Sequence, residues 1–256
     1  TIPLPTATII PTAVITTEAA RLHLAQILSP AFPVGGFAWS QGLEWAMDAG
    51  AVTRATLPQW LADWLDHGAG WTDAVLAALS LRATDHAALD DLARAACLTA
   101  QRLAETVEQG TAFAANIAAL TGLPQPGAAL PVAFGRTCAA LPLPHGEIIA
   151  AFLQAQAAAL ISAAVRFLPL GPVEGQRMLG ALQPAILAAA ADRAARMAEE
   201  LEAIRANVGN TGPQAPDVID VGLAFGPQAK EEGLISPYMV QTWDTIPDTA
   251  KDPDGY

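Results

Sequence analysis

Apolar residues recur at intervals of three and four over most of residues 18–206 of this chain, which is the spacing of amphipathic helices. Two series keep this spacing over several turns: Leu89, Leu92, Ala96, Thr99, Leu103 and Val107, and Leu187, Ala190, Ala194, Met197, Leu201 and Ile204. No segment alternates apolar and polar residues well enough to predict a β-strand. The sequence therefore predicts an all-α fold, a single-domain helical bundle-like globule over residues 18–206.

Capping residues predict where some of these helices begin and end. Thr56 and Gln59 have the spacing of a capping box, so we expect them to open a short helix that ends at Gly68. Thr72 is a candidate cap for the helix that follows. The inward face of the first of these helices is expected to carry four large side chains: Trp60, Leu61, Trp64 and Leu65.

Glycine and proline predict further boundaries. Gly122 and Pro124 are expected to close a helix that begins near Thr111, because neither residue favours continuing it. Pro172 and Pro184 are expected at helix starts, where the missing proline N–H leaves no bond unmade.

Residues 148–165 carry no charge over 18 positions, which approaches the length of a membrane span. The segment is mostly alanine, contains Gln154 and Gln156, and is followed by Arg166, so lipid would gain little from it and would desolvate two amides. We therefore expect a buried central helix and no membrane contact.

The two ends of the chain differ from this helical region. Residues 1–17 contain three prolines and no basic residue, so we expect a flexible N-terminal segment and not a signal peptide. Residues 207–256 contain six prolines, six glycines, eight acidic residues and both lysines of the chain. Such a composition predicts an irregular acidic C-terminal tail without a core of its own.

Composition and charge narrow the classes of function. Of the 256 residues, 52% are hydrophobic and 15% are charged, which excludes a disordered acidic chain. The net charge of −12 repels phosphate backbones and anionic lipids, so no nucleic-acid partner is expected. Cys97 and Cys138 are the only cysteines and form no Cys-x-x-Cys motif, so we expect two buried, reduced thiols in a cytoplasmic protein.

The motifs that would carry catalysis or bind a metal are mostly missing. A phosphate-binding loop ends in Gly-Lys-Ser/Thr, yet the first lysine of the chain is Lys230. No two of the four histidines have the i, i+4 spacing that would place two imidazoles on one helix face: they are His23, His67, His86 and His145. We expect no catalytic site, no metal and no cofactor.

One enzyme-like motif remains around Ser40. Residues 38–42, AWSQG, have the form of a nucleophile elbow, and His145 follows in the chain order of a hydrolase triad. An elbow must follow a buried strand, and prolines such as Pro30 and Pro33 cannot complete a sheet ladder. A serine hydrolase that uses Ser40 therefore stays a minor alternative.

The segment 28–50, LSPAFPVGGFAWSQGLEWAMDAG, combines a glycine turn with polar and aromatic residues. Pro33 with Gly35 and Gly36 predicts a tight turn, and large apolar anchors are expected on the helix that follows: Phe37, Trp39, Leu43 and Trp45. The polar residues among these anchors either face solvent at a helix start or form a patch that receives a partner protein: Ser40, Gln41 and Glu44.

This segment strongly resembles the opening motif of the UreF family of urease accessory proteins. Residues 166–179, RFLPLGPVEGQRML, resemble the second motif of that family, and LTAQRLAETVEQGTAF at 98–113 is similar to its middle helices. The resemblance runs from about residue 22 to about residue 206. Nothing after Asn207 matches the ending that the family usually has, with its Arg-His-Glu and Ser-Arg-Leu-Phe.

The resemblance implies an all-helical protein without enzymatic activity of its own. Family members dimerise, bind UreD (also called UreH) and recruit the GTPase UreG, which couples GTP hydrolysis to nickel delivery into apo-urease. By this resemblance, the partner face is expected to include Gly36, Ser40, Gln41, Glu44, Gly171, Gly175, Gln176 and Arg177. We expect Gln176 to contact a partner, and Arg177 to combine such a contact with an internal pair to a carboxylate such as Glu44. The alternative function is a helical adaptor of an unrelated cytosolic complex.

Overall fold

The computed structural model describes residues 16–194 and Lys230. The chain divides into two units, Thr1–Arg196 and Met197–Tyr256, and every helix below belongs to the first unit. Residues 16–194 contain helices and loops but no strand, which confirms the all-α prediction. The predicted flexible segment lies outside the described residues except for Thr16 and Thr17, and the predicted tail does so except for Lys230.

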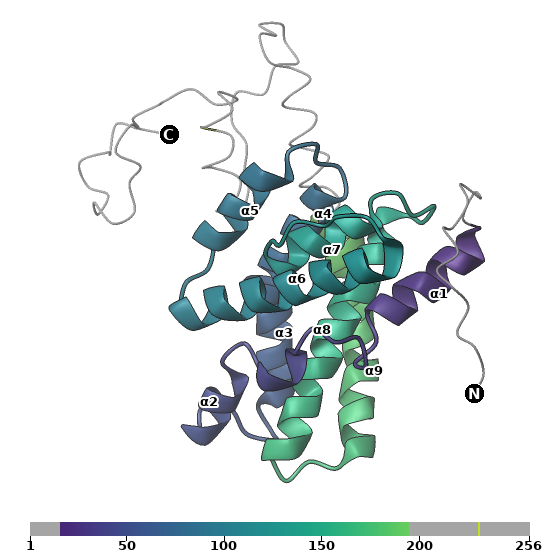
Figure 1. Cartoon of the computed structure of the whole chain (residues 1–256). Helices are drawn as coiled ribbons and strands as arrows, with labels where there is room; N and C mark the ends of the chain where they lie inside the picture. The colour runs from purple at the N-terminus through teal and green to yellow at the C-terminus, as the bar shows by residue number, and fades with distance from the viewer. Residues whose placement is uncertain (1–15, 195–229, 231–256) are drawn as a thin grey trace, which may run out of the picture. The chain divides into compact units, whose positions relative to one another are not determined.

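The described helices follow one another through short connections (Figure 1). In chain order they are α1 (Thr17–Ile27), the 3-10 helix η1 (Gly36–Ala38), α2 (Leu43–Asp48), α3 (Leu57–His67), α4 (Ala69–Ser80), α5 (His86–Ala95), α6 (Ala100–Thr121), α7 (Leu130–Cys138), α8 (His145–Phe167), α9 (Pro172–Ala188) and the π-helix η2 (Ala189–Ala194).

Helix α8 is the central helix of this unit, as predicted for the uncharged stretch. It packs against α4, α9, α2 and η2, and a chain of aromatic rings joins it to α7 and α6. Phe152 of α8 stacks on Phe134 at 4.7 Å between ring centroids, and Phe134 meets Phe113 at 6.3 Å. By length and composition α8 is apolar enough to cross a membrane, but 56% of its most apolar window is buried inside the unit.

Small residues allow three pairs of helices to approach closely. At Gly110 of α6, a Cβ atom would lie 2.0 Å from the carbonyl oxygen of Ala128. Gly135 of α7 lies against Ser80 of α4 in the same way, and Gly175 of α9 lies against α8. Because these contacts leave no space for a side chain, glycine decides how near the helices can come.

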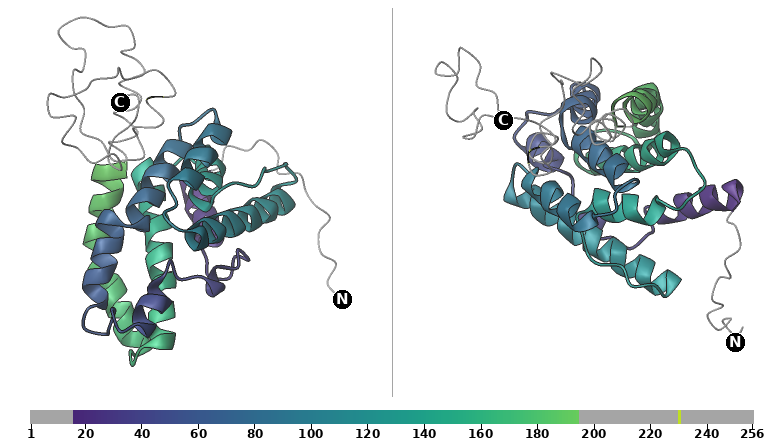
Figure 2. Two further views of the ribbon diagram at one scale, coloured as in Figure 1. Left: turned by 90° about the vertical axis from the view of Figure 1, so that its left-hand side faces the viewer. Right: turned by 90° about the horizontal axis from the view of Figure 1, so that it is seen from above.

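Helices α8 and α9 run antiparallel side by side, as the views in Figures 1 and 2 agree. The turn between them, residues 168–171, lies at the same end of the unit as α2 (Figure 1). At the other end of α8, Arg21 of α1 forms a two-pronged ion pair with Glu147, with bonds of 2.6 and 3.1 Å. The fold thus brings α2 and the turn 168–171, which are about 125 residues apart in the sequence, to the same end of the unit.

Three capping predictions are wrong or partly wrong. Helix α3 does begin after Thr56 and end before Gly68, but the Thr56 side chain makes no capping bond and pairs with Thr53 instead. The Gln59 amide donates to Asp63 at 2.9 Å and does not close a capping box. Gly68 precedes α4, so Thr72 lies inside that helix and donates back to the Gly68 carbonyl.

The first apolar series does not form one stripe. Helix α5 ends at Ala95, and the Thr99 hydroxyl caps α6 by accepting the Arg102 N–H at 3.1 Å. The intervening Leu98 is 97% exposed. The preference of threonine for an N-cap therefore interrupts the spacing. In the second series Leu187 is exposed, Ala190 is buried, and the members from Met197 onward lie outside the described residues.

The glycine and proline predictions are right at two positions and wrong at a third. Gly122, with φ of 72°, closes α6, although α6 begins at Ala100 and not near Thr111. Pro172 occupies the first turn of α9 as expected, whereas Pro184 lies inside α9. The carbonyl that a proline at this position leaves without a helical bond is that of Gly180, which is exposed to water.

Candidate functional site

The two family-like segments are connected by side chains at one end of the unit. Arg166, in the last turn of α8, forms an ion pair with Glu44 of α2 at 3.5 Å. The same guanidinium lies over the exposed Phe37 ring, 4.1 Å from its centroid. Arg54, just before α3, forms a 2.8 Å ion pair with Glu174 in the first turn of α9. Side chains at this end therefore join η1, α2, the segment before α3, α8 and α9.

The predicted site residues on α9 fall into an exposed set and a buried one. Gly171 precedes α9 and has open space around it, and Gln176 and Arg177 are exposed. No hydrogen bond or ion pair of these two side chains with another residue of 16–194 is found. Gly175 is buried, because its Cα packs against Ile161 and Val165 of α8. Gly175 thus sets the spacing of the two helices and does not present a surface.

The predicted site residues of the first segment make local contacts. The Ser40 hydroxyl accepts the Glu44 N–H at 3.2 Å, and Gly36 lies near the Gln109 side chain. Glu44 pairs with Arg166 and not with Arg177, so the expected pair between Glu44 and Arg177 is wrong. Arg166 takes this place because it ends α8 directly against α2.

Gln41 is turned inward. Its backbone has φ of 52°, in the left-handed region that favours glycine, and it is the one non-glycine residue with positive φ among those described. Its side-chain oxygen accepts the Trp64 indole N–H at 2.6 Å. The structure gives the Gln41 side chain a partner inside the unit, and its expected place on the partner face stays a prediction.

Of the four expected apolar anchors, two are exposed, Trp39 is half-buried and one is buried. Phe37 is 78% exposed and Trp45 is 74% exposed, whereas Leu43 is fully buried. Phe37 and Trp39 also precede α2 and do not belong to it. The prediction that all four anchor the helix is therefore wrong. Helix α2 is only six residues long, and its buried positions are Leu43 and Met47.

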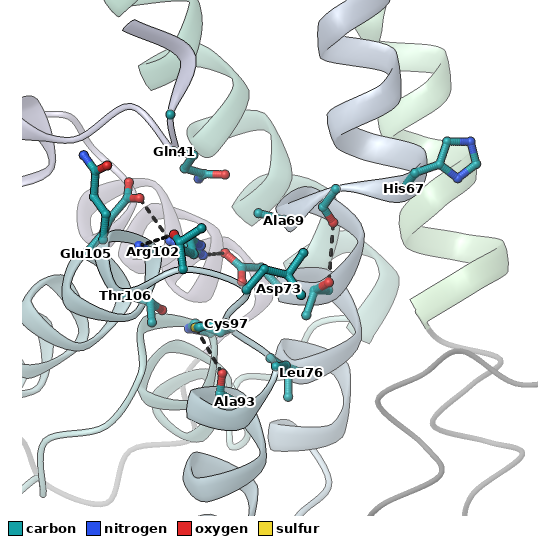
Figure 3. Close-up of a pocket in the computed structure, with 18 of the residues that line it drawn as sticks. Gln41, His67, Ala69, Asp73, Leu76, Ala93, Cys97, Arg102, Glu105 and Thr106 are labelled. Carbon is teal, nitrogen blue, oxygen red and sulfur yellow. Dashed lines mark hydrogen bonds and ion pairs between the residues drawn. The ribbon is translucent and has the colours of Figure 1, made fainter. Parts of the chain in front are cut away.

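A pocket of about 390 Å³ lies behind this segment (Figure 3). Gln41 and Trp45 line one side, and the other sides come from the start of α4, the end of α5 and the first half of α6. Figure 3 shows His67 directed away from the other labelled side chains. Thr99 and Leu98 contribute to the wall where α5 gives way to α6.

Three charged side chains form an ion cluster on the pocket wall. Arg102 bonds to Asp73 at 2.5 Å and pairs with Glu105 at 3.5 Å. The Gln109 amide donates to Glu105 at 3.4 Å. Burial raises the pKa of both carboxyls, and the nearby Arg102 opposes that rise. The backbone N–H of Gln41 also lowers the pKa of Glu105, which ties the first segment to the cluster.

The sequence alone did not predict this cluster. Its one local signal was the i, i+3 spacing of Arg102 and Glu105. Asp73 lies 29 positions away in the sequence, so only the folded chain shows that it completes the set.

The structure argues against the hydrolase alternative. A 3-10 turn precedes Ser40 where an elbow needs a strand. The Ser40 hydroxyl accepts the Glu44 N–H, and the Glu44 side chain forms an ion pair with Arg166. Arg166 lies near the C-terminal end of α8, whereas His145 begins that helix. At 1.5 Å per residue, those ends are about 30 Å apart, so His145 cannot act on Ser40.

The described residues also offer no group of side chains that could bind a metal ion. In the part of the chain that the structure describes, no three His, Cys, Asp or Glu side chains gather as a metal site. Both cysteines are free thiols, Cys138 buried and Cys97 half-buried in the pocket wall.

Comparison with known proteins identifies the family. A family model described as UreF matches residues 51–183, more than half of the chain. The chain belongs to the UreF family of urease accessory proteins. The UreF match includes the second motif at 166–179 and begins directly after the first motif at 28–50.

Several curated proteins named urease accessory protein UreF are similar to this chain. The protein from Paracoccus denitrificans is 81% identical over 178 residues, which cover 69% of this chain and 83% of the relative. A protein from Cereibacter sphaeroides is 56% identical over 178 residues, covering 69% and 85%. The protein from Dinoroseobacter shibae is 40% identical over 203 residues, covering 78% and 97%. These relatives support a role in urease maturation.

Proposed function

We propose that this UreF-family chain is a non-enzymatic scaffold of urease maturation in the cytoplasm. It binds UreD (UreH), recruits the GTPase UreG and so assists nickel insertion into apo-urease, acting as a homodimer. Nickel is the cargo of this process and not a resident cofactor of the chain.

The observation that carries the proposal is the convergence of the two family motifs at one end of the helical unit. The first motif contributes the exposed Phe37 and Trp45, and the second contributes the exposed Gln176 and Arg177. Aromatic and arginine side chains of this kind are enriched at the centres of protein interfaces. The ion pair of Arg166 with Glu44 holds the two motifs together. This end of the unit is therefore the proposed partner face.

The charge of the chain fits a scaffold better than a nucleotide-binding role. The chain has a net charge of −12 and no lysine before Lys230, so residues 1–229 lack the lysine that a phosphate-binding loop uses. In the proposed assembly, UreG supplies the phosphate chemistry. The UreF-family chain supplies surface and orientation.

Alanine substitutions on α9 test the proposal. Gln176→Ala and Arg177→Ala should leave the melting temperature nearly unchanged, since neither side chain bonds to another residue of 16–194. Each should weaken UreG recruitment by roughly 2 kcal/mol or more, as expected of an interface hot spot. The measurement is a pull-down of UreG by the UreD-bound variants, read beside their melting curves.

Gln183→Ala is the matched control. Gln183 is also exposed on α9, but it lies seven residues, or about two turns, further from the turn. It should recruit UreG as the unaltered chain does. Unchanged recruitment by both Gln176→Ala and Arg177→Ala would exclude this part of α9 from the partner face.

A further inference from the structure

The pocket behind Gln41 carries one more negative than positive charge. Asp73 and Glu105 are only 5% and 3% exposed, and the single Arg102 serves both of them. Among the described residues that line the pocket, no other side chain carries a formal charge when His67 is neutral. A buried carboxylate without a full counter-charge is costly, so a second cation in this pocket would be favourable.

The titration of the two carboxyls agrees with this charge balance. Burial raises the pKa of Asp73 and of Glu105, and the presence of Arg102 does not cancel the rise in either. For both carboxyls, burial thus outweighs the opposing effect of the one guanidinium on the pKa. A proton or a cation from outside the unit can supply what is missing.

The mouth of the pocket favours a cation attached to an apolar stem. Trp45 and Leu98 line the pocket and are 74% and 97% exposed, although both are large apolar residues. Further inside, the wall includes Leu76, Ala93 and Ala96. A volume of about 390 Å³ accommodates one long side chain. Arginine and lysine bring an aliphatic stem together with a charged head.

We propose that this pocket receives an arginine or lysine side chain of a partner protein, whose apolar neighbours cover Trp45 and Leu98. The proposal deepens the function above, on which the identity of the partner as a urease maturation protein rests. The cation approaches Asp73 and Glu105 on the side that Arg102 leaves open. A chain with a net charge of −12 also attracts a basic partner surface over distance.

A free metal ion fits the pocket less well than a protein side chain. Arg102 already engages both carboxylates, and no third metal-binding side chain joins them among the residues described. A metal ion would also leave the exposed Trp45 and Leu98 uncovered. A partner segment with apolar residues on both sides of its arginine or lysine would bury Trp45 and Leu98.

Capped tripeptides test the pocket directly with the full-length chain. The probes are Leu-Arg-Leu, the same peptide with norleucine in place of arginine, and the same peptide with glutamate, each titrated by nuclear magnetic resonance at about 20 mM salt, where charges are weakly screened. We expect the arginine peptide to bind about 10-fold more tightly than the norleucine peptide, a ratio that corresponds to about 1.4 kcal/mol. The glutamate peptide should not bind.

Variants locate the binding in this pocket. Glu105→Gln should remove most of the preference for arginine over norleucine. Because that buried substitution can disturb packing, the exposed Trp45→Ala and Leu98→Ala provide a second test, and each should weaken both peptides by about 10-fold. Leu120→Ala, at a leucine that is 56% exposed outside the pocket, is the matched control and should change nothing.

Three results would overturn the proposal. Equal binding of the arginine and norleucine peptides would show that the carboxylates recognise no cation. Binding of no peptide would show that the excess charge is met by a proton. If Trp45→Ala dissociated a homodimer while no peptide bound, the pocket would belong to the contact between two copies. All three results leave UreG recruitment by Gln176→Ala as a separate test of the proposed function.

Discussion

Replacing Gly110 with alanine tests the close approach of α6 to the start of α7. An added Cβ would lie 2.0 Å from the Ala128 carbonyl oxygen and 2.5 Å from the Leu130 nitrogen. Both atoms belong to the backbone, so no side-chain rotation can relieve the contact. The two segments must separate instead, and Gly110→Ala should therefore destabilise the unit.

The size of the effect follows from what the separation breaks. The Leu130 N–H donates to Thr106 at 3.2 Å and the Ala129 N–H donates to Asp90 at 2.6 Å, and both bonds lie beside the contact. Losing them costs about 1 kcal/mol each, and overpacking costs about 1–3 kcal/mol more. Replacing a helical glycine with alanine returns about 1 kcal/mol. The net loss should be about 3 kcal/mol.

Gly180→Ala is the matched control, because Gly180 is also inside a helix but has nothing within 4 Å of an added Cβ. It should stabilise the unit by about 0.5–1 kcal/mol through helix propensity. Urea unfolding followed by circular dichroism at 222 nm measures both variants. For a unit of this size the melting temperature should fall by about 6–12 °C for Gly110→Ala. Equal stability of Gly110→Ala and the unaltered chain would refute the packing argument.

Four further predictions concern charge, thiols, assembly and activity. Burial raises the folded-state pKa of Glu105 above its ordinary 4.5, so between those two values the folded chain holds more protons than the unfolded chain. The free energy of unfolding should therefore fall as pH rises through that window. Urea titrations at several pH values should show a weaker pH dependence for Glu105→Gln. Burial raises the pKa of Cys138 to about 12, so iodoacetamide at pH 8 should alkylate Cys97 well before Cys138 in the folded protein. A homodimer held by apolar faces should survive high salt, and sedimentation of a monomer at micromolar concentration would count against it. The isolated chain should give a strongly helical spectrum, hydrolyse no GTP and bind no stoichiometric nickel, and GTP turnover would contradict the scaffold.

Local signals predicted the parts of the fold that depend on a residue's own backbone preference. Gly122 ends α6 because it adopts a positive φ, and Pro172 begins α9 because its fixed φ suits the first turn. The uncharged stretch at 148–165 was predicted to be a buried central helix because its alanine-rich composition gains little from lipid, and α8 is indeed central and carries buried residues along its length. Pro184 shows the limit of such signals, since it lies inside α9, where the residue whose carbonyl it leaves without a helical bond, Gly180, is exposed.

The candidate site was predictable only in part. The resemblance predicted Gln176 and Arg177 as site residues, and both lie on the surface. It also predicted Gly175, which belongs to the same motif but is buried against α8. The inward turn of Gln41 depends on Trp64, which is 23 residues away. The ion cluster depends on Asp73, which reaches Arg102 only after α4 and α6 have both packed against α7. Contacts between distant segments leave no pattern in a single sequence.

The position of α8 along the chain also has a consequence for synthesis. Its mean hydropathy of 1.9 is that of a membrane span, so a nascent chain that exposed it for long would offer a target to hydrophobic surfaces. Helix α9, which is its most extensive neighbour, and η2 follow it in the sequence, whereas α2, α4 and the Phe134 ring of α7, which cover other parts of its surface, precede it. Since chains are made from the N-terminus, these preceding helices have left the ribosome before α8 does. Helix α9 and η2 are made afterwards, so part of the apolar surface of α8 stays uncovered until they have left the ribosome and packed against it.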